Sequence, residues 1–402
     1  MNKKAVLLST VAILLLGTGM ARASCDPSFV RQNGRIITVL PTNSDDTANL
    51  QCAFALGSRM PGVVLQLIKG TYITGRLKVD GFVGIFRGAG MKSTTIRNSD
   101  TPIYVTPDDF YQTDPNSNAY APPILIVFLG GDYTVSDLTV SIVGAEPATD
   151  WSIFGVRNWL GHGVKSLAAP FVILGSPTGN GYRQANAAFY RVKVTGQLSN
   201  DPIYGYNLYN GVFAEGFVGP ELQPLKGRFS VRNSIFDTVG SPSPVENLQD
   251  SLVSLSGNTL NNVVIGGEVV DLKHTVYEFS NNAVTGSTGV QMYDSCLGAQ
   301  WNCGMDGSEL IISNNQFQST DGVLIDASFS GGTTALVLGN DFSQVSDLAV
   351  RLGSNTSNSL VVLTAPATIE DLGTGNVVIG PKQTNVNQKT RVQPHLRIGS
   401  HP

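Results

Sequence analysis

YEFSNNAV, residues 277–284, is one of five segments in which an apolar stretch runs into a small polar turn with asparagine. The other four are FSVRNSIF (229–236), SLSGNTLN (254–261), IISNNQFQ (311–318) and LVLGNDFS (336–343). Their asparagines, taken as Asn233, Asn258, Asn281, Asn314 and Asn340, are 25, 23, 33 and 26 residues apart. A repeat of nearly fixed length is typical of a solenoid, in which each repeat is one unit of structure.

A repeat of about 25 residues with three short strands fits one coil of a right-handed, single-stranded parallel β-helix. Coils stacked about 4.8 Å apart bury a continuous core that no single coil could bury alone. Asparagine suits the bend between two strands, because it tolerates positive φ and its amides can hydrogen-bond up the stack. A β-sandwich is the alternative all-β fold, but its strands have no reason to repeat at this interval.

Helical periodicity is confined to one place after the N-terminal segment, residues 46–58 (DTANLQCAFALGS). Asp45 or Asp46 can cap this helix, and its apolar stripe contains Leu50, Ala53, Phe54 and Leu56. The stretches that follow, VVLQLIKGTY, GFVGIFRGAG and TTIRN, have the pattern of short strands. The sequence therefore predicts an all-β protein, a parallel β-helix with an N-terminal capping helix.

A family resemblance is carried by residues 43–98, which contain the Asp-rich entry, the capping helix, KGTY and GAG…TTI. This stretch resembles the N-terminal cap and first coils of the pectin-lyase-like superfamily. The resemblance is close over residues 40–98 and continues as a general coil pattern to about residue 380. It implies the fold but not the reaction, because the superfamily includes lyases, hydrolases, epimerases, phage spikes and non-enzymatic binders.

The chain begins with a secretory signal, predicted over residues 1–23. Lys3 and Lys4 precede an apolar run, and Ala21-Arg22-Ala23 supplies the small-residue cleavage site. The β-helix domain is predicted over residues 24–380 and a basic, flexible tail over residues 381–402. The protein is accordingly expected to be secreted or periplasmic, without a transmembrane segment.

Four cysteines fit an oxidising compartment, where they can form two disulfides. Cys296 and Cys303 are seven residues apart and would close a small loop, which leaves Cys25 to pair with Cys52. Only 14% of the residues are charged and the formal net charge is −4. This balance excludes nucleic acid as the expected partner, since that partner requires a basic footprint.

Acidic residues recur at one offset from the repeated asparagines. Glu246, Asp271 and Asp294 lie thirteen residues after Asn233, Asn258 and Asn281, and Asp326 lies twelve after Asn314. Neighbouring coils would then present carboxylates in one row, at a spacing near that required for glycoside hydrolysis. The alternative is that these acids are solvated turn residues at the corners of the coils.

Other side chains could complete this site. Lys273, just beyond Asp271, would be a base or charge neutraliser, and a cation such as Ca²⁺ could hold the acidic row together. Tyr293 and Trp301 lie beside or within the predicted Cys296–Cys303 loop, where an aromatic ring could stack on sugar. We predict Asp271, Asp294 and Lys273 as catalytic residues and Glu246, Asp326, Tyr293 and Trp301 as substrate-binding residues.

The predicted function is cleavage of an extracellular polysaccharide, by β-elimination or by hydrolysis. The R-x-P-x-x-R element of pectate lyases and the D-P-H-D element of alginate epimerases are absent. A non-catalytic carbohydrate-binding or surface protein is therefore the second hypothesis, and a trimeric spike-like assembly is the third. Monomer and homotrimer both remain open.

Overall fold

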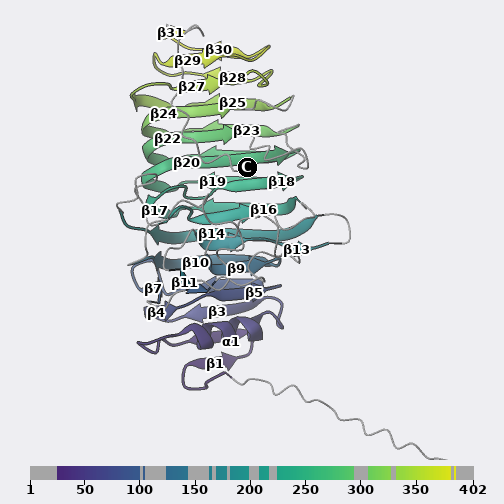
Figure 1. Ribbon diagram of the computed structural model, residues 1–402, viewed down its shortest axis with the longest axis vertical. Coiled ribbons are helices and arrows are strands. Elements are labelled where there is room, and N and C mark those ends of the chain that lie inside the picture. The colour runs from purple at the N-terminus through teal and green to yellow at the C-terminus, as the bar shows by residue number, and fades with distance from the viewer. Residues whose placement is uncertain are drawn as a thin grey trace, which may run out of the picture.

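The computed structural model describes residues 25–99, 124–143, 169–178, 182–198, 208–216, 224–293, 307–326 and 332–381, and the strand backbone at 103–104, 163–164 and 384–385. Its strands stack as successive coils along one axis, and consecutive coils pair in parallel (Figure 1). The fold is a right-handed, single-stranded parallel β-helix, as predicted. The coils have three faces, which we call A, B and C.

Face A contains the outward side chains of the candidate site. Its strands, in stacking order, are β5 (Leu77–Asp80), β9 (Ile124–Leu129), β12 (Ala169–Ile173), β15 (Val212–Glu215), β18 (Val245–Gln249), the second halves of β20 (Thr259–Lys273), β22 (Ala283–Tyr293) and β24 (Gln316–Asp326), then β27 (Val350–Leu352), β29 (Thr368–Asp371) and β31 (Thr384–Asn385). Pairing with β29 therefore continues to Asn385, within the segment predicted as a tail.

Face B runs almost the full length of the stack. Its strands are β2 (Ile36–Val39), β3 (Val63–Leu67), β6 (Val83–Arg87), the first halves of β10 (Asp132–Ser141) and β14 (Arg183–Thr195), then β16 (Leu225–Arg232), β19 (Leu252–Ser256), β21 (Val276–Ser280), β23 (Glu309–Ser313), β25 (Thr334–Leu338), β28 (Leu360–Val362) and β30 (Val377–Ile379).

Face C completes each coil. Its strands are β4 (Gly70–Thr74), β7 (Thr94–Asn98), the second halves of β10 and β14, β17 (Ile235–Val239), the first halves of β20, β22 and β24, and β26 (Asp341–Val345). Three short antiparallel pairings lie outside this pattern: β1 (Val30–Asn33) with β2, β13 (Ser176–Pro177) with β14, and β8 (Ile103–Tyr104) with β11 (Gly163–Val164).

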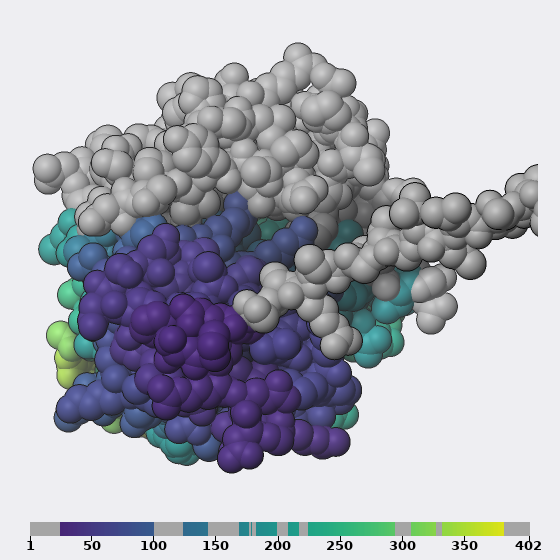
Figure 2. Space-filling view, turned by 90° about the horizontal axis from the view of Figure 1, so that it is seen from below, coloured from purple at the N-terminus to yellow at the C-terminus, as the bar shows by residue number. Residues whose placement is uncertain are grey.

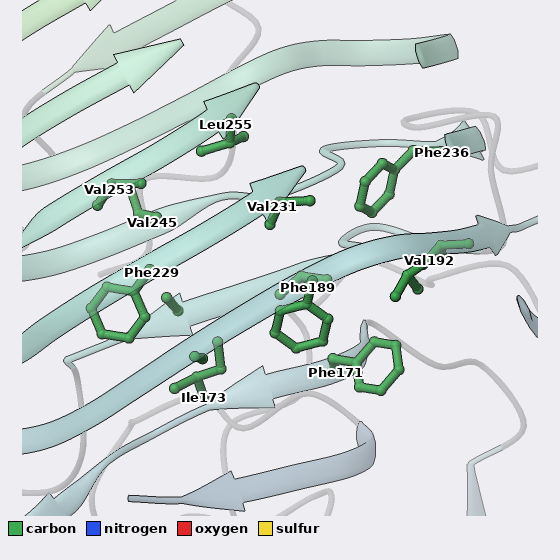
Figure 3. Close-up of a cluster of buried hydrophobic side chains, with 14 of the residues drawn as sticks. Phe171, Ile173, Phe189, Val192, Phe229, Val231, Phe236, Val245, Val253 and Leu255 are labelled. Carbon is green, nitrogen blue, oxygen red and sulfur yellow. The ribbon is translucent and has the colours of Figure 1, made fainter. Parts of the chain in front are cut away.

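The interior is filled by the alternate side chains of all three faces. Phe171, Phe189 and Phe236 come from β12, β14 and β17 and point into the same space (Figure 3). The rings of Phe171 and Phe189 meet edge to face, with centroids 5.1 Å apart. Because strand side chains alternate, each inward residue places its neighbours on the outer surface.

The capping helix α1 (Thr47–Gly57) lies at the N-terminal end of the stack (Figures 1 and 2). Leu50, Ala53 and Phe54 are buried as predicted, whereas Leu56 is only partly buried. Asp46 occupies the N-cap position, but its carboxylate accepts hydrogen bonds from the amides of Thr42 (2.8 Å) and Ile73 (3.1 Å) instead of a helix amide. The disulfide between Cys25 and Cys52 joins the described N-terminus to this helix. No helix among the described residues is long and apolar enough to cross a membrane.

The repeated asparagines form two neighbouring columns at the corner between faces B and C. One column has positive φ and contains Asn233 (50°), Gly257 (65°), Asn281 (56°), Asn314 (55°) and Gly339 (63°). The residue after each belongs to a second, buried column, in which amides stack as Asn258, Asn282, Asn315 and Asn340. The sequence predicted that one column of asparagines would both form the bend and stack its amides. That prediction was wrong, because in each coil one residue adopts the positive φ of the bend and the next residue belongs to the amide ladder.

Candidate functional site

A row of outward side chains runs up face A from β15 to β24. Glu215 lies opposite Glu246, Glu246 opposite Val270, Val270 opposite Tyr293, and Tyr293 opposite Asp326. Paired residues of neighbouring strands are about 4.8 Å apart at their Cα atoms. Two glutamates of successive coils therefore face outward one above the other.

A second outward row begins two residues earlier on each strand and contributes a third glutamate. Glu268 of β20 lies opposite Gln291 of β22. The Tyr293 hydroxyl, at the end of β22, donates a 2.7 Å hydrogen bond to Oε1 of Glu268. Tyr293 thus connects the two rows.

Glu246 and Asp326 lie in one row, as predicted, but the predicted row was wrong in register at Asp271. Asp271 follows Val270, the residue that actually lies opposite Glu246. The thirteen-residue count failed because Asn233 belongs to the bend and Asn258 to the amide ladder, one residue later. Asp271 itself has a φ of 49°, so it sits in the bend that follows the outward row.

Asp271 nevertheless belongs to the carboxylate cluster, which we define as Glu215, Glu246, Glu268 and Asp271. Glu268 and Asp271 are only 3% and 7% exposed, whereas Glu215 and Glu246 are half-buried. The negative charges of Asp271 and Glu268 both act on Glu246. The cluster therefore combines burial with like charges, two effects that favour the protonated form of a carboxyl group.

The pKa values of the glutamates follow from these surroundings. Burial, with the charges of Asp271 and Glu268, raises the pKa of Glu246 to about 8. Burial, with the charge of Glu246, raises the pKa of Glu215 well above its usual value. Burial also raises the pKa of Glu268, against the hydrogen bond from Tyr293. Glu246 is therefore a carboxyl group that keeps its proton near neutral pH.

Apolar side chains adjoin the cluster on the N-terminal side. Phe213, two residues before Glu215, lies opposite Val172, and Val172 opposite Val127. These outward residues belong to a second buried apolar group, formed by Ile124, Val127, Leu129, Ala169, Val172, Leu174 and Phe213. A low-dielectric neighbourhood of this kind explains why Glu215 is costly to ionise.

The raised pKa of Glu246 predicts a pH-dependent stability. The folded state keeps the proton between about pH 4.5 and pH 8, where the unfolded chain has released it. Stability therefore falls as pH rises through this window, and levels off above it. Glu246→Gln removes the titration and should raise the free energy of unfolding by about 5 kcal/mol at pH 9, with little change at pH 4.5. Denaturant unfolding at both pH values measures this, and an equal effect at both would contradict it. Glu309→Gln, an exposed acid on face B, is the control.

Lys273 and Asp326 lie at the margins of the cluster. Lys273 pairs in register with Gln249, beyond the bend at Asp271. Asp326 lies 3.6 Å from the Arg351 guanidinium, which also contacts Glu370 at 2.6 Å. Asp326 is therefore part of an ion-paired group next to Tyr293.

The remaining predicted site residues, Asp294, Cys296, Trp301 and Cys303, lie outside the described residues. Two members of the cluster, Glu215 and Glu268, were missed by sequence reasoning. Their signal was a single glutamate in an otherwise apolar strand, in VFAE for Glu215 and IGGEVV for Glu268. Among the residues with described positions, no group of three or more His, Cys, Asp or Glu side chains could hold a metal ion.

Comparisons with known proteins find similarity to solved structures of low sequence identity. No family model matches the chain, and no curated protein matches it significantly. A polygalacturonase of Erwinia carotovora matches with 12% identity and a TM-score of 0.42, over 92% of this chain and 100% of that one. The A-module of a mannuronan C-5 epimerase of Azotobacter vinelandii matches with 15% identity and a TM-score of 0.34, over 86% and 96%. A surface adhesin of Streptococcus pneumoniae matches with 10% identity and a TM-score of 0.41, over 86% and 90%.

Sequence identities of 10–15% and TM-scores of 0.34–0.42 assign no activity, substrate or partner to this chain. The likeness is one of fold. The stacked coils and the capping helix themselves have the architecture implied by the resemblance to the pectin-lyase-like superfamily.

Proposed function

We propose that this protein is a secreted or periplasmic enzyme that hydrolyses a glycosidic bond of an extracellular polysaccharide. Glu246 is the general acid and Asp271 the ionised partner, which acts as base or nucleophile. The observation that carries the proposal is the pKa of Glu246, raised to about 8 by burial and by Asp271 and Glu268. Two carboxyl groups in different protonation states are what glycoside hydrolysis requires.

The neighbouring groups have supporting roles in this proposal. Glu268, hydrogen-bonded to Tyr293, maintains the negative field that keeps Glu246 protonated. The positions of Val270 and Asp271 place the Cα atoms of Glu246 and Asp271 about 6 Å apart, within reach of one sugar ring. The buried apolar residues next to Glu215 keep this end of the cluster in a low-dielectric environment, which favours protonated carboxyl groups. The predicted signal sequence and the Cys25–Cys52 disulfide support export from the cytoplasm.

Hydrolysis is favoured over β-elimination by the kind of groups assembled. Elimination needs a base to remove a proton next to a uronate carboxyl group, together with positive charge for the enediolate. A protonated carboxyl group at neutral pH is instead suited to donating a proton to a leaving oxygen. Asp294, predicted from the sequence as catalytic, and Trp301, predicted as substrate-binding, are proposed to belong to the same site.

The test is a screen of acidic and neutral polysaccharides in which reducing ends and absorbance at 235 nm are measured together. Hydrolysis releases reducing ends without the unsaturated product that absorbs at 235 nm. We expect cleavage to depend on the protonated acid, so kcat/KM should decline tenfold per pH unit above about pH 8. Absorbance at 235 nm would instead show elimination, and binding without new reducing ends would favour the carbohydrate-binding hypothesis.

A further inference from the structure

The exposed hydrophobic side chains of this protein gather on the outer surface of face B, away from the carboxylate cluster. Nine large hydrophobic side chains are exposed in the described part of the chain, and seven of them lie on strands of face B. The other two are Val143 and Leu198. Soluble monomers rarely leave much contiguous apolar surface exposed, so a face with this concentration is a candidate interaction surface.

One apolar patch lies at the N-terminal end of face B. Ile36 of β2 lies opposite Val64 of β3, and Val64 lies opposite Ile85 of β6. Ile36 and Ile85 are 43% and 38% exposed, and Val64 is half-buried. Val83, two residues before Ile85 on the same strand, also points outward. Four aliphatic side chains therefore cover three successive rungs.

A larger apolar patch lies at the opposite end of the same face, on four rungs that follow one another at the C-terminal end of the stack (Figure 1). A second row of this patch, two residues further along each strand than the first, contains Leu338, Val362 and Ile379. Ile379 is 54% exposed. The first row has one outward side chain from each strand: Ile311 of β23, Leu336 of β25, Leu360 of β28 and Val377 of β30.

Between the two patches the outward side chains are small or polar. The row that begins at Ile36 passes through five such residues before it reaches Ile311. The five are Thr134, Ala188, Ser230, Ser254 and Glu278. The row therefore has aliphatic residues at both ends and the same order in either direction. A second copy, inverted about a two-fold axis, would place aliphatic ends on aliphatic ends and the polar middle on the polar middle.

We propose that two copies of this protein pack face B against face B, with the axes of their β-helices antiparallel. The two-fold axis runs along the strands, between the levels of Ser230 and Ser254. It places Ile85 of one copy over Leu336 of the other. Face A remains open in both copies, so the proposal goes beyond the reaction assigned to Glu246 and does not rest on it.

The size of the face is that of a stable dimer interface. Face B has twelve strands, which span about 53 Å at about 4.8 Å per strand. Three alternate outward residues make it about 13 Å wide, so each copy would bury about 700 Å². Standard protein interfaces bury about 800 Å² per partner. A lipid surface is a poorer match, because it would bury the polar middle together with the two ends.

The charges of the middle also fit the inverted arrangement. Glu278 of one copy comes to lie one rung from Arg228 and Arg232 of the other, so opposite charges approach each other. Asp132 and Glu309 face each other at one margin, where both are exposed to solvent and the repulsion is screened.

The test exchanges charge across the proposed contact and measures dimer dissociation by analytical ultracentrifugation of the full chain over a concentration series. The wild type should sediment as two chains. Ile85→Lys alone and Leu336→Asp alone should each weaken the dimer at least a hundredfold, because each buries a charge against an aliphatic side chain at two places.

The variant that combines Ile85→Lys with Leu336→Asp should dimerise at least tenfold more tightly than either single variant. In the antiparallel dimer, the ammonium group of one copy then faces the carboxylate of the other. Within one chain the two positions are seven rungs apart, about 34 Å, so this rescue requires a second copy. The matched control is Leu198→Asp, which adds a charge at a residue that is 73% exposed and lies outside face B. It should weaken the dimer less than twofold.

Three results would overturn the proposal: a wild type with the mass of one chain at every concentration, a mass of three chains, or a combined variant no tighter than the single variants. Monomeric wild type that binds phosphatidylcholine vesicles would identify the patches as a lipid-binding surface instead. Thermal unfolding shows that each variant is folded. Cleavage of polysaccharide should be the same in all four variants, so failure of the dimer and failure of the proposed reaction are distinguishable.

Discussion

Glu246→Gln is expected to lower the rate of glycan hydrolysis at least a hundredfold, with little change in substrate affinity. Glutamine keeps the size and position of the side chain on β18 but has no acidic proton to donate. General acid catalysis contributes about 10²–10⁴-fold, so this is the scale of the loss. Initial rates of reducing-end release on the best polysaccharide from the screen measure it.

Three further variants test whether the loss of rate is specific to Glu246 and its partner Asp271. Asp271→Asn should cause a comparable loss, because it removes both the ionised partner and a charge that acts on Glu246. Glu309→Gln, on face B, should retain at least half of the wild-type rate. Lys273→Gln should also remain active, since Lys273 lies beyond the bend. Full activity of Glu246→Gln, or abolished activity of Lys273→Gln alone, would contradict the assignment.

Asn282→Ala is expected to lower the free energy of unfolding by about 3 kcal/mol. Its Oδ1 accepts hydrogen bonds from the Asn258 backbone N–H (2.9 Å) and from Asn258 Nδ2 (3.0 Å). Its Nδ2 donates to Leu255 (3.0 Å) and Asn315 (3.1 Å). Asn282 is 1% exposed, so alanine would leave the buried Asn258 backbone N–H without its acceptor. The Asn258 and Asn315 side chains would each lose one of two hydrogen bonds, keeping those to the Val231 carbonyl and from the residue 282 amide. Urea unfolding at fixed pH measures the change.

The adjacent residue supplies the control for this prediction. Asn281 is exposed and has a φ of 56°, so Asn281→Ala should cost only about 1 kcal/mol, from backbone strain. Asn281→Gly relieves that strain and should be close to neutral. Equal destabilisation by Asn281→Ala and Asn282→Ala would show that the two columns do not differ as described.

The fold was predictable because its cause is local and repeated. Each coil needs the same bend, so asparagine or glycine recurs at the same place and reveals the period. The sequence could not separate the bend at Asn281 from the ladder at Asn282, since both positions favour the same residue. The two columns become distinct only when coils stack and one amide is buried.

The candidate site was predictable only in part, because it depends on register. Glu246, Asp271 and Tyr293 were predicted as site residues from the sequence. Glu246 and Asp271 belong to the carboxylate cluster, and Tyr293 donates a hydrogen bond to its member Glu268. A one-residue error in the count nevertheless placed Asp271 in the wrong row. Glu215 and Glu268 were overlooked because single glutamates in apolar strands were not recognised as outward residues of one face.

The most direct test of the account is the titration of Glu246 itself. Carbon-13 labelling of the glutamate carboxyl groups gives signals whose shifts follow protonation, and the Glu246→Gln variant identifies the signal of Glu246 by its absence. We predict a midpoint near pH 8, because burial and the charges of Asp271 and Glu268 disfavour ionisation. A midpoint near 4.5, the ordinary value, would mean that Glu246 is ionised at neutral pH and cannot be the proton donor.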